Sequence, residues 1–77
     1  PRGEVAVGAT VVDALVASGL VESRNAARRV IGEGGVSVNN LKVSDPETLL
    51  GEADFLHGYA ALLRRGRKAQ AAAVRAG

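Results

Sequence analysis

The apolar residues of this 77-residue chain are almost all alanine, valine and leucine, with one Phe, one Tyr and no Trp, Met or Cys. Any core must therefore be built from small aliphatic side chains. A chain this short buries roughly 60% of the surface that its unfolded form exposes, which leaves no room for a substrate pocket with its own supporting residues. We expect one small domain rather than an independent enzyme.

The residue types that usually carry chemistry are scarce. The absence of Cys excludes disulfides and thiolate zinc sites, and it fits a reducing cytoplasm, where we expect the protein to act. His57 is the only histidine and has no partner at the spacing of a metal site or a catalytic motif. Asp54, three residues earlier, indicates a local turn. We predict no catalytic residue, no metal and no cofactor.

The sequence gives no indication of a membrane segment or a leader. No run of about 20 apolar residues is present, so we expect no membrane-spanning helix. No signal peptide is recognisable. The chain opens with Pro1 rather than Met, which we interpret as a processed chain or a fragment of a longer protein.

Charge is distributed unevenly. The formal net charge is only +2. The first 54 residues hold all eight acids and five cations, a balance of −3, whereas the rest hold five cations and no acid, a balance of +5. The cations form two main clusters, Arg24/Arg28/Arg29 and Arg64/Arg65/Arg67/Lys68. If these share a face, they form a cationic surface that the net charge conceals.

A first helix is predicted close to the start. Residues 1–9 show no periodicity, and we interpret them as a linker or a disordered end. Thr10 and Asp13 have the spacing of a capping box, and the apolar residues that follow recur at helical spacing. The pattern predicts a helix over residues 11–18, ended by Gly19.

A second helix carries the first basic cluster. Ser23 is a favourable N-cap, and Arg24 and Arg28, four residues apart, are neighbours on the helix surface. They lie off an apolar stripe made of Ala26, Ala27, Val30 and Ile31. The glycines within residues 32–35 close this helix and lead into a strand, so they indicate a turn and not a phosphate-binding loop.

The second half predicts short strands. Residues 36–38 and 41–43 alternate in polarity, and Asn39-Asn40 between them suits a two-residue hairpin turn. Asp45 is a candidate cap for a single helical turn over residues 47–52. A strand over residues 59–63 is followed by a basic turn over residues 64–68. For residues 69–76, alanine propensity slightly favours helix, although a hairpin partner would require a strand.

The basic clusters indicate RNA. An arginine in the first turn of a helix is slightly unfavourable alone, whereas a phosphate there is attracted by the guanidinium and by the free N–H groups. Only Phe55 and Tyr59 could stack on bases, so phosphate and shape recognition of a folded RNA fits better than single-strand binding. A solvated helix face paired with Glu22 or Glu33 explains the helix arginines equally well.

The first half resembles the RNA-binding domain named for small-subunit ribosomal protein four. The matching positions are Leu15, Gly19, Leu20, Ser23, Ala27, Arg28, Ile31, Gly35, Val36, Val38 and Asn39. The resemblance implies an α+β, S-four-like (αL motif) fold, in which two N-terminal helices pack on a small, mostly antiparallel sheet. Residues 10–77 would form this single domain. We expect core side chains from Leu15, Val30, Ile31, Val36, Val38, Leu56 and Leu62.

Later motifs are similar to the C-terminal domain of bacterial tyrosyl-tRNA synthetases. The most discriminating are His57-Gly58 and Leu63-Arg64-Arg65-Gly66. This resemblance implies an appended domain that grips the anticodon arm and the long variable arm of tRNA(Tyr). It implies a parent protein with an N-terminal catalytic domain that this chain lacks. We expect the isolated domain to be a monomer and the parent to be a homodimer.

By position, the resemblance implies RNA contacts from ten residues: Arg24, Asn25, Arg28, Arg29, Asn39, Lys42, Arg64, Arg65, Arg67 and Lys68. The chain departs from the family at Asn40, where Gly is usual, and at Tyr59, where a basic residue is common. Two alternatives stay open. One is an S-four-like domain of another RNA-binding protein, such as a pseudouridine synthase or a small heat-shock ribosome-binding protein. The other is a protein-docking domain without RNA contact.

Overall fold

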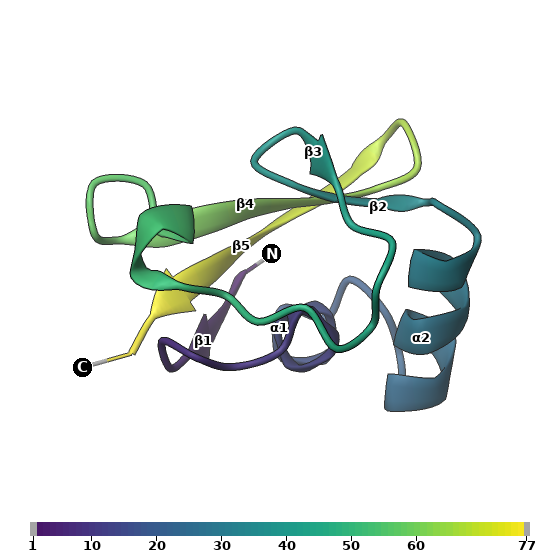
Figure 1. The fold of residues 1–77 in the computed structure, drawn as a ribbon, viewed down its shortest axis with the longest axis horizontal. Coiled ribbons are helices and arrows are strands. Elements are labelled where there is room, and N and C mark those ends of the chain that lie inside the picture. Colours follow the sequence, from purple (N-terminus) through teal and green to yellow (C-terminus); the bar gives the residue numbers. More distant parts are fainter. Residues whose placement is uncertain (1, 77) are drawn as a thin grey trace.

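The computed structural model describes residues 2–76, which form two α-helices and one five-stranded sheet (Figure 1). The elements are β1 (Arg2–Val5), α1 (Val11–Ala17), α2 (Arg24–Gly32), β2 (Val36–Val38), β3 (Leu41–Lys42), the 3-10 helix η1 (Glu52–Asp54), β4 (Ala60–Arg65) and β5 (Ala69–Arg75). The strand order is β1-β5-β4-β2-β3, antiparallel except for the parallel β1–β5 pair. The predicted α+β class, with two helices on a mostly antiparallel sheet, is confirmed. Within residues 2–76, neither helix has the length and apolar character needed to span a membrane.

Helix α1 begins at the predicted capping box. The Thr10 hydroxyl accepts a hydrogen bond from the Asp13 backbone N–H at 3.0 Å, and the Asp13 carboxylate accepts one from the Thr10 N–H at 3.4 Å. The helix ends at Ala17, and Gly19 takes a positive φ of 77°. The prediction for this helix is confirmed to within a residue because its start and stop are both local.

Helix α2 also follows its sequence pattern. The Ser23 hydroxyl accepts a hydrogen bond from the Ala26 N–H at 3.2 Å and so caps the first turn. Ala27, Val30 and Ile31 are buried. The cap fixes where the helix begins, and the buried stripe fixes which side faces the core.

The β2–β3 hairpin turns at Asn39 and Asn40, as predicted. Both take positive φ, 50° and 69°, the conformation of a type I′ turn. The Asn39 side chain does more than tolerate this geometry. Its amide donates to the Asp54 carbonyl at 2.6 Å, and its amide oxygen accepts from the Leu62 N–H at 2.9 Å. This one residue therefore ties the hairpin to both η1 and β4.

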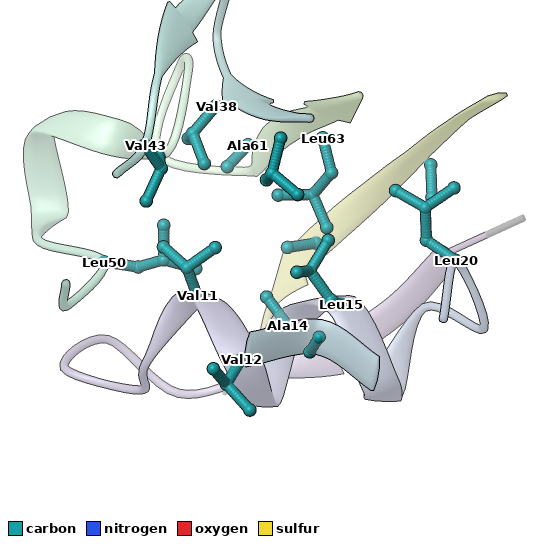
Figure 2. Close-up of a cluster of buried hydrophobic side chains, with 14 of the residues drawn as sticks. Val11, Val12, Ala14, Leu15, Leu20, Val38, Val43, Leu50, Ala61 and Leu63 are labelled. Atoms are coloured by element: carbon teal, nitrogen blue, oxygen red, sulfur yellow. The ribbon is translucent and has the colours of Figure 1, made fainter. Parts of the chain in front are cut away.

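The two faces of the sheet differ in their surroundings. We call the face that packs on the helices the covered face; its side chains are Val36, Val38, Ala61, Leu63, Ala71 and Ala73, all buried. The opposite side we call the open face; its side chains, all half-buried or exposed, are Arg2, Glu4, Ser37, Lys42, Ala60, Leu62, Arg64, Gln70, Ala72 and Val74. Figure 2 shows Leu63 of the covered face meeting Leu15 of α1.

The predicted core is correct at five of seven positions. Leu15, Val30, Ile31, Val36 and Val38 are buried as expected. The prediction for Leu62 is wrong because this side chain lies on the open face, and Leu63 is the buried residue instead. A strand alternates its side chains between faces, so a one-residue error reverses them. Leu56 is also wrong: it is 50% exposed, since it bridges to Ala60 in a turn beyond the sheet.

The N-terminal segment corrects our expectation of a linker or disordered end over residues 1–9 at positions 2–5, whereas Pro1 lies outside the described residues. Arg2–Val5 is a strand that pairs in parallel with β5. Gly3 lies so close to α1 that a Cβ atom there would stand 2.1 Å from the Ala17 carbonyl oxygen. Contacts with β5 and α1 therefore stabilise this strand, because its own sequence shows no strand periodicity.

Two further expectations are corrected in the second half. Residues 69–75 form β5 rather than helix, because pairing with both β1 and β4 outweighs the helical propensity of alanine. Residues 47–52 form no helical turn. Asp45 accepts a hydrogen bond from the Glu47 N–H at 2.9 Å, but Thr48 and Leu50 then bond through their backbones to the chain preceding and entering α1.

Candidate RNA interface

Helix α2 presents one apolar and one basic side. Arg24, Arg28 and Arg29 are exposed, as is Asn25. The apolar stripe on the other side of the helix is buried in the core. All four predicted contact residues on this helix are thus accessible to a partner, and they are held by a helix that is itself anchored.

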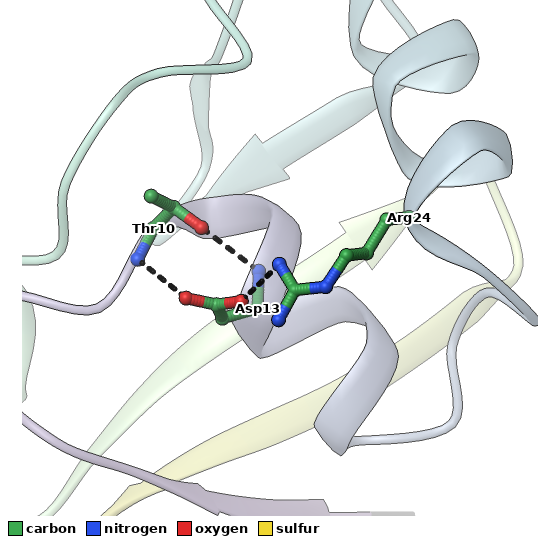
Figure 3. Close-up of polar contacts among 3 residues, drawn as sticks. All are labelled: Thr10, Asp13 and Arg24. Carbon is green, nitrogen blue, oxygen red and sulfur yellow. Dashed lines mark hydrogen bonds and ion pairs between the residues drawn. The ribbon is translucent and has the colours of Figure 1, made fainter.

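Arg24 is positioned by the neighbouring helix. Its guanidinium forms an ion pair with Asp13 of α1 (Figure 3). The Arg24 guanidinium is the main cause that lowers the pKa of the Asp13 carboxyl below its ordinary value of 3.8. Desolvation opposes this effect, and each hydrogen bond with Thr10 lowers the pKa by a smaller amount. Asp13 therefore caps α1 and orients Arg24. The sequence indicated only the cap, because nothing local shows that α1 and α2 meet there.

Arg28 and Arg29 are differently placed. Within residues 2–76, neither forms an ion pair, and neither Glu22 nor Glu33 pairs with this helix. The pairing with Glu22 or Glu33 is therefore absent among these residues, and the arginines lie on a solvent-exposed helix face. Two guanidinium groups remain on the surface, where they could bind phosphate oxygens bidentately.

The second basic cluster lies at the same end of the molecule. Arg67 and Lys68 are exposed in the β4–β5 turn, which projects at the right of Figure 1, above α2. The Gly66 N–H donates to the Gly35 carbonyl at 2.8 Å. This bond holds the basic turn against the loop that leaves α2, so the two clusters share one end of the domain.

Arg64 and Arg65 belong to β4 rather than to the turn, and they point to opposite faces. Arg65 is paired with Val36 on the covered side, and its guanidinium donates to the Leu20 carbonyl at 3.2 Å. Arg64 is paired with Ser37 and lies on the open face. Arg65 thus braces the connector between the helices, while Arg64 faces away from them.

The two hairpin residues predicted to contact RNA also differ. Both polar groups of the Asn39 side chain are engaged by the backbone of the domain, which assigns this residue a structural role. Lys42 is exposed, and the end of its side chain lies beside Gly34, in the loop after α2. Lys42 therefore adds a cation to the end of the domain that carries the other clusters.

His57 is a turn residue, as predicted. It is exposed and takes a positive φ of 57°. In the part of the chain that the structure describes, no three His, Cys, Asp or Glu side chains come together as a metal site.

Comparison with known proteins agrees with the synthetase motifs. Residues 1–72 match the family described as the tyrosine–tRNA ligase SYY-like C-terminal domain. The chain is 61% identical over 67 residues to the tyrosine–tRNA ligase of Acidothermus cellulolyticus and 51% identical over 69 residues to that of Nocardia farcinica. It is 54% identical over 67 residues to that of Mycobacterium tuberculosis.

These matches cover 87–90% of this chain but only 16% of each ligase. The chain thus corresponds to one domain of those enzymes and does not include their catalytic part. The identities, the matched length and the basic end of the fold point to one assignment. The chain belongs to the family of tyrosine–tRNA ligase SYY-like C-terminal domains.

Proposed function

We propose that this chain is the tRNA-binding domain appended to a tyrosyl-tRNA synthetase. The observation that carries the proposal is the shared end of the domain, where the exposed arginines of α2 and the basic β4–β5 turn are held together by the Gly66–Gly35 hydrogen bond. Membership in a ligase C-terminal domain family supports tRNA as the ligand. The chain itself binds and does not catalyse.

The chemistry of binding is electrostatic. Guanidinium forks bind phosphate oxygens in pairs, and each phosphate that a cation neutralises releases counterions. Affinity should therefore fall steeply as salt is raised. The scarcity of aromatic side chains fits the contour of a folded RNA better than stacking on unpaired bases.

The proposal extends to the partner and its setting. We propose that the ligand is tRNA(Tyr), gripped at its anticodon and long variable arms, and that the fold is of the S-four-like type. We further propose a cytoplasmic, homodimeric parent protein in which a catalytic domain lies N-terminal to this domain. The names of the ligases that the chain resembles support this setting.

Substitution on α2 tests the proposal. We expect the double variant Arg24→Ala/Arg28→Ala to bind a tRNA(Tyr) transcript more weakly and to lower the slope of log affinity against log salt by about 1–2. Arg2→Ala/Arg75→Ala, which also removes two exposed cations, both outside the two clusters, is the matched control. Thermal unfolding of all three proteins separates binding from folding. An unchanged slope in a folded double variant would exclude α2 as the RNA surface.

A further inference from the structure

A row of polar side chains crosses the open face of the sheet near its basic end. The strand registers place Lys42 beside Ser37, Ser37 beside Arg64, and Arg64 beside Gln70. Side chains at paired positions lie on the same face of a sheet. These four residues, which we call the polar row, therefore form a line across β3, β2, β4 and β5.

The polar row differs from the rest of the open face. The adjoining positions on β4 and β5 are Leu62 and Ala72, which are apolar. The registers also place two charged residues of β1 on this face, Arg2 beside Ala72 and Glu4 beside Val74, both outside the row. The row thus combines two cations with two neutral hydrogen-bonding groups and contains no carboxylate, a composition that suits an anion.

Arg64 stands at the centre of the row and has an unused donor. Its side chain is half-buried on the sheet, and its Nε atom is buried without a hydrogen-bond partner among residues 2–76. Buried donors in proteins are normally satisfied. Because Nε is buried, an acceptor from solvent would meet the terminal nitrogens of the guanidinium instead, with the Ser37 hydroxyl and the Gln70 amide on either side as further donors.

We propose that the polar row is a second phosphate-binding surface for the RNA backbone, separate from the arginines of α2. The inference rests on the proposed function and adds to it. Helix α2 packs on the covered side, whereas the row lies on the open face. The β4–β5 turn, with Arg67 and Lys68, joins the two surfaces at one end. A bound RNA therefore presents different phosphates to the helix and to the sheet.

Charge substitution within the row tests this. We expect Arg64→Gln to lower the salt slope for a tRNA with a long variable arm by about 0.9 and to weaken binding roughly tenfold at low salt. Arg75→Gln, which removes a strand cation outside the row, should leave both quantities within error of the original chain. Phosphate-footprinting should show that Arg64→Gln and Arg28→Ala lose protection at different nucleotides.

A second variant covers the case in which Arg64→Gln unfolds. Gln70 is exposed, so Gln70→Lys should fold and raise the salt slope by about 0.9. Ala53→Lys, at an exposed position of η1, adds the same charge away from the row and should raise it less.

The outcomes separate the two proposals. If the unmodified chain binds tRNA but every row variant matches its control, the polar row is not a phosphate surface and the proposed function stands. Loss of the same protected nucleotides in Arg64→Gln and Arg28→Ala would also overturn a separate surface. If the unmodified chain binds no RNA at low salt, the proposed function fails and this inference fails with it.

Discussion

The two faces of the sheet differ in role: one forms the core and the other is accessible to solvent. The covered face is built from alanine, valine and leucine that pack on α1 and α2, and Leu63 there is fully buried. On the open face the neighbouring residues, Leu62 and Arg64, remain accessible. In β4, adjacent positions in the sequence thus serve the core and the solvent alternately.

The comparison teaches how so small a domain combines stability with charge. Its core has no large aromatic cluster, since Phe55 is the one buried aromatic residue between positions 2 and 76. Small residues instead allow the backbones to pack closely. Gly3 brings β1 against α1, and alanines line the covered side of β5. The cations lie on the outer surface of α2, at the β4–β5 turn and on the open face, where their charged groups stay in contact with water.

The largest difference between the faces should appear in Leu63→Ala and Leu62→Ala. We expect Leu63→Ala to lower the free energy of unfolding by about 2–5 kcal/mol, because it leaves a cavity in the core. Leu62→Ala should cost about 1 kcal/mol or less. Urea unfolding followed by circular dichroism measures both. Equal losses would mean that the faces are not distinct in packing.

The edge strand β1 gives a second contrast, between Gly3→Ala and Glu4→Ala. A methyl group at Gly3 would meet the Ala17 carbonyl, so we expect a loss of about 1–3 kcal/mol in the free energy of unfolding. Glu4 lies on the open face, and its replacement should change stability by no more than about 0.5 kcal/mol. Hydrogen exchange at Val5 would reveal whether β1 separates from β5 in the Gly3 variant. Equal stability in the two variants would refute the close packing of β1 on α1.

The hairpin offers a contrast between two adjacent asparagines. Asn39→Gly keeps the freedom to adopt positive φ but removes two hydrogen bonds to β4 and to the segment at η1. We expect it to cost about 1–2 kcal/mol in the free energy of unfolding. Asn40→Gly, at the other turn position, should be neutral within about 0.5 kcal/mol. If thermal or urea unfolding finds the two variants alike, the Asn39 amide contributes only turn geometry.

The smallest effect should come from the ion pair between the helices. The pKa of Asp13 is lowered in the folded chain, so its contribution to stability is present above the unfolded value of 3.8 and is lost as pH falls through the folded value. Asp13→Asn keeps a side-chain acceptor for the Thr10 N–H but removes the charge. Melting temperatures of both proteins between pH 7 and pH 2 should differ above pH 4 and converge below it. A difference that is constant with pH would exclude the ion pair as its cause.

The parts of the fold that the sequence predicts are those with local causes. Thr10, Ser23 and the asparagine pair fix α1, α2 and the β2–β3 turn within a few residues of where they stand. Strands β1 and β5 have no capping or turn residue of this kind to mark them in the sequence. Ala71 and Ala73 become strand because they pair with β4 and β1, a tertiary effect that outweighs helical propensity.

In the candidate site, too, some features have local causes and others depend on tertiary contacts. The arginines of α2 could be recognised from their spacing, because a helix places residues four apart together. The pairing of Asp13 with Arg24 and the separation of Arg64 from Arg65 depend on how α1 packs and how the strands register. Sequence therefore identifies the cations, and only the fold shows where each one points.

The most direct test of the account is a binding titration of this chain with tRNA(Tyr), beside a tRNA with a short variable arm, at two salt concentrations. The account predicts tighter binding to tRNA(Tyr) and a marked loss of affinity as salt rises. Equal affinity for both tRNAs would contradict the proposed specificity and leave a general RNA grip. An absence of binding to either at low salt would contradict the central claim that this domain binds RNA.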